Sequence, residues 1–187
     1  MLVNLQKRYV VRTASLSAFA RNLKRRLRLG CRKFNICFVD DKAIRHLNLA
    51  YRGKDKATDV LSFRWNEAAG AECPQPSGTA FPAVRTGETP VPPRLPGRIT
   101  NFLGDVVISV ETARRNARGE GHSTLNEIRW LILHGVLHLL GYDHECDVGE
   151  MTALEVALRE RLGVAGARRK SKSKGKTQKS KVNAGVV

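Results

Sequence analysis

Residues 131–144 read LILHGVLHLLGYDH, and this stretch determines how the rest of the sequence is interpreted. His134 and His138 lie four residues apart in a run of large aliphatic side chains that predicts a buried helix over residues 124–140. Residues four apart in a helix lie on the same face, one turn above the other. Gly141 predicts the end of that helix and a sharp turn, after which His144 can return to the side of the other two.

The three histidines form the pattern H-x3-H-x5-H, which is typical of a metal site. Three neutral imidazoles can hold Zn²⁺ and leave a fourth position open for water, as in catalytic rather than structural zinc sites. The alternative is that His134 and His138 are ordinary core histidines, but imidazoles buried among leucines without polar partners would be costly. The sequence therefore predicts one Zn²⁺ per chain, held by His134, His138 and His144, with His46 and His122 outside the site.

The same spacing occurs in metzincin peptidases, whose pattern is H-E-x-x-H-x-x-G-x-x-H. Gly135 stands where those peptidases carry the glutamate that acts as general base, so a peptidase of that mechanism is disfavoured. Four carboxylates remain candidates for a general base. One of them, Asp143, could instead orient a ligand imidazole. The sequence does not choose among these candidates, which are Asp59, Asp105, Asp143 and Glu145.

The remaining sequence predicts short strands and amphipathic helices along one chain. Strands are predicted at residues 3–11, 34–39, 59–65 and 103–110, and helices at 15–29, 41–51, 111–118, 124–140 and 150–162. Thr124 to Glu127 fits a capping box at the start of the histidine-bearing helix. The helix over residues 41–51 is expected to bury Ile44, Leu47 and Tyr51.

Proline marks one segment that does not belong to the core. All seven prolines fall between Pro74 and Pro96, and proline blocks both helical and sheet hydrogen bonding. We expect residues 68–98 to form a disordered loop insertion within a single domain that spans residues 1–166. Residues 167–187 are rich in lysine and serine and are expected to form a basic, disordered tail.

Charge indicates the class of partner. The chain has 33 Lys and Arg against 17 Asp and Glu, which gives a formal net charge of +16. The excess lies at the two ends, because the middle segment 34–167 is nearly neutral. Basic segments bind polyanions by releasing counterions, so nucleic acid is the expected partner, although basic ends could also serve only solubility. The chain shows no bilayer-length apolar run, no apolar signal segment and no CxxC pair, which favours a cytoplasmic protein with free thiols.

Three ordered motifs resemble the YbeY family of bacterial endoribonucleases and rRNA maturation factors. They are the histidine motif at 134–144, the segments 47–53 and 58–63, and the segment 103–109, which reads LGDVVIS. The resemblance implies an α+β, zincin-like fold in which a small mixed β-sheet is flanked by helices and the metal lies at the end of a central helix. It also implies hydrolysis of single-stranded RNA, maturation of the 3′ end of 16S rRNA and late-stage quality control of the 70S ribosome. The implied partner is the small ribosomal subunit, with no role for DNA or membrane.

Arg52 matches the functional arginine of that family. A guanidinium can grip phosphate oxygens through two parallel hydrogen bonds, which suits it to contact the substrate or the transition state. The alternative is a surface arginine at the end of the preceding helix. The sequence departs from the family after Phe63, where Arg64 and Trp65 stand in place of the usual proline-containing segment. The competing function is a non-catalytic, metal-stabilised ribosome-assembly factor that binds rRNA.

Overall fold

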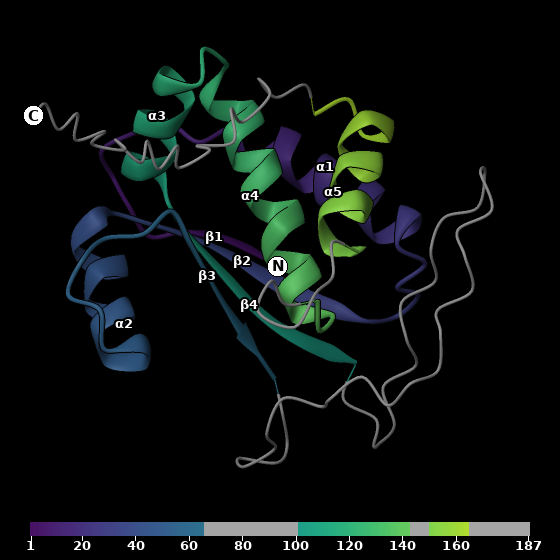
Figure 1. Ribbon diagram of the computed structural model, residues 1–187, viewed down its shortest axis with the longest axis horizontal. Coiled ribbons are helices and arrows are strands. Elements are labelled where there is room, and N and C mark those ends of the chain that lie inside the picture. The colour runs from purple at the N-terminus through teal and green to yellow at the C-terminus, as the bar shows by residue number, and fades with distance from the viewer. Residues whose placement is uncertain (66–100, 143–149, 165–187) are drawn as a thin grey trace, which may run out of the picture.

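The computed structural model describes residues 1–65, 101–142 and 150–164, and a four-stranded mixed sheet lies at its centre (Figure 1). The spatial order is β1-β2-β4-β3, so β3 forms one edge of the sheet. The first three strands in this order run parallel, whereas β3 pairs with β4 in the antiparallel direction. The strands are β1 (Leu2–Asn4), β2 (Lys33–Val39), β3 (Val60–Arg64) and β4 (Phe102–Ser109).

Helices cover both faces of the sheet. One face carries α2, and the opposite face carries α4 with α1, α3 and α5 around it (Figure 1). Side chains alternate across β4, so Val106 and Ile108 join the larger core under α4, whereas Val107 joins the smaller core under α2. The helices are α1 (Thr13–Arg26), α2 (Asp41–Arg52), α3 (Val110–Gly119), α4 (Thr124–Leu139) and α5 (Glu150–Arg161).

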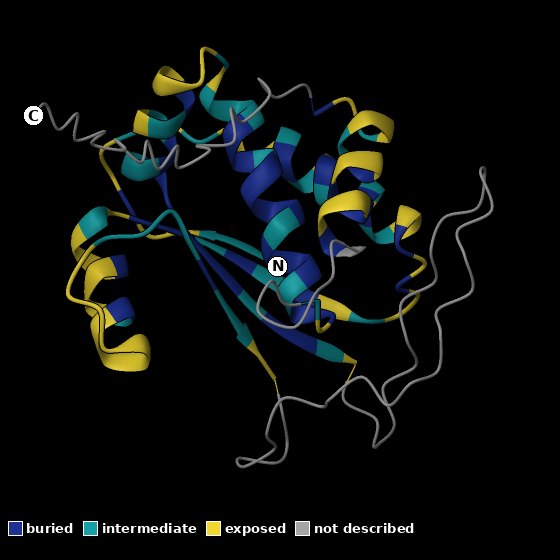
Figure 2. Cartoon of the chain, in the orientation of Figure 1, coloured by how far each residue is buried: buried dark blue, intermediate teal, exposed yellow. Residues whose placement is uncertain are grey.

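The central position of α4 follows from its composition. Most of its side chains are buried on all sides, because the sheet lies beneath it and α1, α3 and α5 pack around it (Figure 2). A helix that is apolar around its whole circumference is stable only in such a setting. None of the helices within the described ranges is both long enough and apolar enough to span a membrane.

The predicted α+β class with a small mixed sheet between helices is confirmed, and each predicted helix is present. The capping box is displaced by one residue, because the Ser123 Oγ caps α4 by accepting from the Asn126 N–H at 3.2 Å. Glu127 instead accepts from the His122 ring at 2.8 Å. The predicted insertion 68–98 and tail 167–187 lie outside the described residues.

Two further local predictions are wrong. The strand predicted over residues 3–11 ends at Asn4, because the buried Gln6 side chain bonds both the N–H and the carbonyl of Tyr9 and holds this segment as a loop. Tyr51 is 69% exposed rather than buried. Asn48 takes the inward position on α2, where its side chain donates to the Lys56 carbonyl at 2.8 Å and fixes the turn that follows the helix.

Candidate metal centre

His134 and His138 lie on the same side of α4, in its C-terminal half, as their spacing predicts. The two rings meet edge to face with their centroids 4.7 Å apart. Their Nε2 atoms are 3.2 Å apart, within hydrogen-bonding distance, so these two nitrogens are neighbours on that side of the helix. The helix ends at Leu139, and Gly141 in the turn that follows has a φ of 101°, which is accessible to glycine at low cost.

The spacing of the two nitrogens fits a shared metal ion. Two nitrogens that each lie about 2.0–2.1 Å from a tetrahedral zinc ion are about 3.3–3.4 Å apart. The distance of 3.2 Å between His134 Nε2 and His138 Nε2 is close to that value. The third predicted ligand, His144, lies in the segment 143–149, outside the described residues. Within the described ranges, no group of three or more His, Cys, Asp or Glu side chains is placed to hold a metal ion.

The Glu155 carboxylate of α5 lies beside Nδ1 of His134, the ring nitrogen other than the one that lies near His138. Its Oε2 lies 3.5 Å from His134 Nδ1, and its Oε1 accepts from the indole N–H of Trp130. Burial raises the pKa of Glu155, but its interactions with His134, Trp130 and Arg159 outweigh burial and hold the pKa below its ordinary value. A carboxylate at Nδ1 favours the tautomer whose Nε2 lone pair is available to a metal.

Sequence reasoning missed Glu155, although a signal for it was present. Met151, Leu154, Glu155 and Leu158 follow the i, i+3, i+4, i+7 spacing of a buried helix face, and all four are buried. A carboxylate on such a face is rarely buried without a partner. The identity of that partner depends on the packing of α5 against α4, which the local sequence does not reveal.

Gly135 explains why the metzincin glutamate is absent from this chain. A Cβ atom at this position would lie 2.5 Å from Val106 Cγ1 and 3.1 Å from Ser62 Oγ. Ser62 Oγ also donates to the Gly135 carbonyl at 3.1 Å, which ties β3 to α4 at the crossing point. The helix therefore approaches the sheet too closely here for any side chain, and no general base can occupy the position.

Arg64 at the end of β3 lies beside the C-terminus of α4. Its Nη2 is 3.4 Å from the His138 carbonyl oxygen and would be 2.4 Å from a Cβ atom at Gly141. The guanidinium thus packs on the exposed face of Gly141, next to a predicted metal ligand. Arg64 is exposed, and no carboxylate in the described part of the chain forms an ion pair with it. Sequence reasoning noted this residue only as a departure from the family pattern.

Arg52, the predicted phosphate-binding residue, is the last residue of α2 and is exposed. Its neighbour Tyr51 contacts Phe63 of β3, with 4.9 Å between ring centroids, so this end of α2 lies against the strand that carries Arg64. Gly53 caps the helix through its left-handed conformation. The Arg52 side chain has no hydrogen-bonding partner among the described residues, and no contact between it and the histidine pair is seen.

Two of the candidate general bases have structural partners. Asp59 accepts from its neighbour Val60 N–H at 2.9 Å and from Asn116 at 3.3 Å, and it thereby fixes the start of β3. Asp105 accepts from Asn35 at 2.9 Å across the β2–β4 pair. The other two candidates, Asp143 and Glu145, lie outside the described residues.

A hollow of about 760 Å³ lies between α2 and the sheet, and neither histidine of the pair lines it.

Comparisons with known proteins give a consistent result. A family model described as endoribonuclease YbeY matches residues 4–163. A curated endoribonuclease YbeY of Desulforamulus reducens is 44% identical over 69% of this chain and 71% of its own. The one from Aquifex aeolicus is 40% identical over 78% of this chain and 77% of its own. The one from Solibacter usitatus is 39% identical over 82% of each.

A solved structure shares the fold. The solution structure of TM1509 from Thermotoga maritima matches 87% of this chain and 89% of its own, with a TM-score of 0.52 and 21% identity. At that identity the match supports the fold alone.

Proposed function

The chain belongs to the YbeY endoribonuclease family, and from that premise we propose that it is a zinc-dependent endoribonuclease that cleaves single-stranded RNA. The proposed task is maturation of the 3′ end of 16S rRNA and late-stage quality control of the 70S ribosome, on the small subunit and in the cytoplasm. The observation that carries the proposal is the distance of 3.2 Å between His134 Nε2 and His138 Nε2. Two imidazoles arranged in this way fit a metal, and the net charge of +16 fits an RNA substrate.

Each of the described residues near the histidine pair has a different proposed role. His134 and His138, together with His144, would hold the ion, and Glu155 would keep the Nε2 of His134 directed at it. When bound, Zn²⁺ supplies Lewis acidity and lowers the pKa of a water molecule bound to it to about 7. Arg64, with its guanidinium next to the His138 carbonyl, is placed to bind a phosphate oxygen near the ion.

Cleavage of a defined single-stranded RNA tests the proposal directly. We expect the purified protein to cut the RNA internally, to lose this activity when a chelator removes the metal, and to regain it when Zn²⁺ is restored. A duplex of the same sequence should be cut much more slowly. Binding of RNA without any metal-dependent cleavage would refute the nuclease and support the non-catalytic assembly factor instead.

Arg52→Lys tests the role proposed for the family's arginine. Lysine keeps the positive charge but loses the planar fork that can bind two phosphate oxygens at once. We therefore expect single-turnover cleavage to fall by about tenfold or more, as for other lost transition-state contacts, with little change in RNA affinity. Arg21→Lys, at an exposed position of α1, is the matched control and should leave both quantities unchanged. Equal losses of affinity and turnover in Arg52→Lys would assign Arg52 to general binding only.

A further inference from the structure

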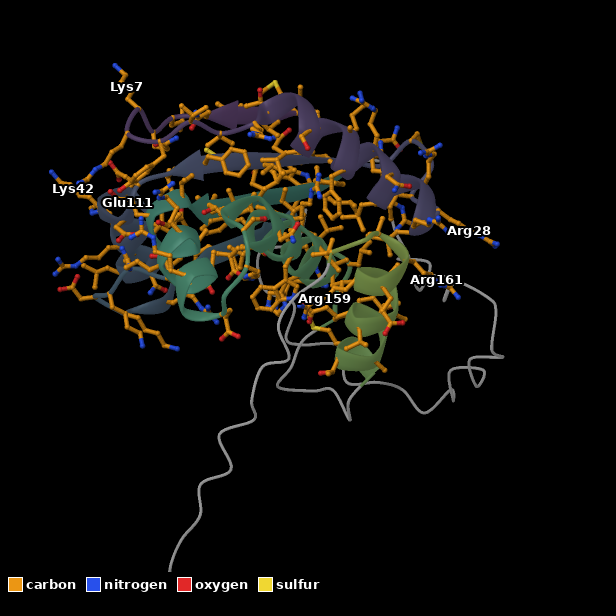
Figure 3. The ribbon with its side chains drawn as sticks, turned by 90° about the horizontal axis from the view of Figure 1, so that it is seen from above. Lys7, Arg28, Lys42, Glu111, Arg159 and Arg161 are labelled. Carbon is orange, nitrogen blue, oxygen red and sulfur yellow. The ribbon has the colours of Figure 1, made fainter. Side chains whose placement is uncertain are left out.

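A cluster of arginines lies at the end of the sheet where β2 and β4 finish, away from the histidine pair. β4 begins near the pair, since Gly104 faces Arg64, and it ends at Ser109. Five residues of extended chain span about 17 Å. The cluster lies beyond that end, where Lys7, Lys42 and Glu111 gather at one end of the molecule (Figure 3). A hollow of about 360 Å³ is lined there by four arginines with Tyr9, Asp41 and Glu111.

Tyr9 is the rigid centre of this cluster. The buried Gln6 side chain donates to the Tyr9 carbonyl at 2.7 Å and accepts from the Tyr9 N–H at 2.8 Å, so the loop that carries the ring is fixed at both backbone groups. The guanidinium of Arg114 lies 4.4 Å from the centre of the Tyr9 ring, and that of Arg8 lies 5.6 Å from it. Both distances fall within the range of a cation–π interaction, which positions guanidinium groups without neutralising them.

Charge pairing within the cluster leaves two arginines available. Arg8 is paired with Glu111 at 2.8 Å, and Arg115 with Asp41 at 2.6 Å. Burial raises the pKa of Asp41, but hydrogen bonds from Arg115, Ser109 and Thr112 outweigh burial and lower it, so this carboxylate stays charged.

Arg114 and Arg118, in contrast, form no ion pair with any carboxylate that the structure describes. They are four residues apart on α3, so both project from the same face of that helix. Two charged guanidinium groups, one of them stacked on a fixed ring, therefore face the hollow without neutralising partners.

We propose that Arg114, positioned by Tyr9, and Arg118, one turn along the same helix, form a second binding site for the phosphate backbone of single-stranded RNA, remote from the site of cleavage. The inference rests on the proposed function for the identity of the ligand. Guanidinium groups bind phosphate oxygens in the plane of the fork, and each phosphate contact releases counterions. An RNA strand that reaches from the histidine pair along the sheet would contact this site with nucleotides other than those that react.

The double variant Arg114→Ala, Arg118→Ala tests the site by RNA binding at several salt concentrations. For a long single-stranded RNA, we expect the slope of log affinity against log salt to fall by about 1.4, because each lost phosphate contact on a single strand removes about 0.7. Arg21→Ala, Arg25→Ala removes the same charge from an exposed face of α1 and is the matched control. Cleavage of a trinucleotide, which is too short to reach the cluster, should be unchanged in both variants.

The result that overturns the proposal is a slope in the double variant equal to that of the α1 control. The double variant Arg114→Lys, Arg118→Lys keeps both positive charges and provides a second measurement. Its slope of log affinity against log salt should match that of the wild-type protein. A slope as low as that of the double alanine variant would refute the phosphate site. Failure of the nuclease proposal is a separate outcome, because it would appear as absence of cleavage in the wild-type protein while the difference in salt slope persists.

Discussion

His138→Ala protein is expected to purify with little or no zinc and to lose metal-dependent cleavage of single-stranded RNA. The substitution removes one of the two Nε2 atoms that lie 3.2 Å apart, and it leaves only two of the three predicted ligands, His134 and His144, which are too few to hold the ion tightly. Alanine favours a helix more than histidine does, so α4 should remain intact. Elemental analysis of the purified protein, with circular dichroism to verify the helix content, measures the effect.

The matched control is His46→Ala, which makes the same chemical change at an exposed position of α2. This control should retain both metal and cleavage. Glu155→Gln should give an intermediate result, with metal affinity about 10–100-fold weaker, because it keeps the shape of the side chain but removes the charge beside His134 Nδ1. Wild-type zinc content in His138→Ala would show that the ion is held elsewhere, and the proposed site would have to be abandoned.

Gly135→Ala is expected to destabilise the fold, because overpacking a tight core costs about 1–3 kcal/mol. The added Cβ would lie 2.5 Å from Val106 Cγ1, at the point where α4 crosses the sheet. The intrinsic helix preference of alanine over glycine, about 1 kcal/mol, opposes this effect, so the expected net loss is at most about 2 kcal/mol. Chemical denaturation followed by circular dichroism gives the free energy of unfolding of each variant.

Gly119→Ala is the control for this measurement, because nothing lies within 4 Å of a Cβ atom placed there at the end of α3. It should leave the free energy of unfolding unchanged or slightly increased. Gly135→Glu, which introduces the metzincin residue, should be more destabilising than Gly135→Ala. Wild-type stability of Gly135→Ala would mean that α4 can move away from the sheet without penalty, contrary to the packing described above.

Local sequence patterns were sufficient to predict the five helices and three of the four strands that the structure describes, and the proximity of His134 and His138. A spacing of four residues within one helix fixes the relative positions of two side chains without any knowledge of the rest of the fold. The run of Val106, Val107 and Ile108 likewise predicts a strand whatever its neighbours are. Caps are less certain: Ser123 and Thr124 are adjacent residues with similar capping ability, and only the structure shows that Ser123 is the cap.

The contacts that complete the site could not be predicted, because they join segments that are far apart in the chain. Glu155 reaches His134 only because α5 packs against α4, and Arg64 reaches the His138 carbonyl only because β3 ends at the C-terminus of that helix. Tyr51 was expected to be buried from its spacing, yet Asn48 occupies the inward position because its amide fixes the turn after α2. Side-chain hydrogen bonding of this kind overrides apolar spacing.

The close approach of α4 to the sheet at Gly135 also limits the evolutionary routes open to this scaffold. A glutamate at position 135 would require space that Val106 and Ser62 now fill from two different strands. A lineage could acquire the metzincin base only by enlarging that gap first, through changes that leave a cavity in the core until the glutamate arrives. A single substitution at position 135 therefore does not convert this pair of histidines into a metzincin site, because the core around Val106 and Ser62 must change as well.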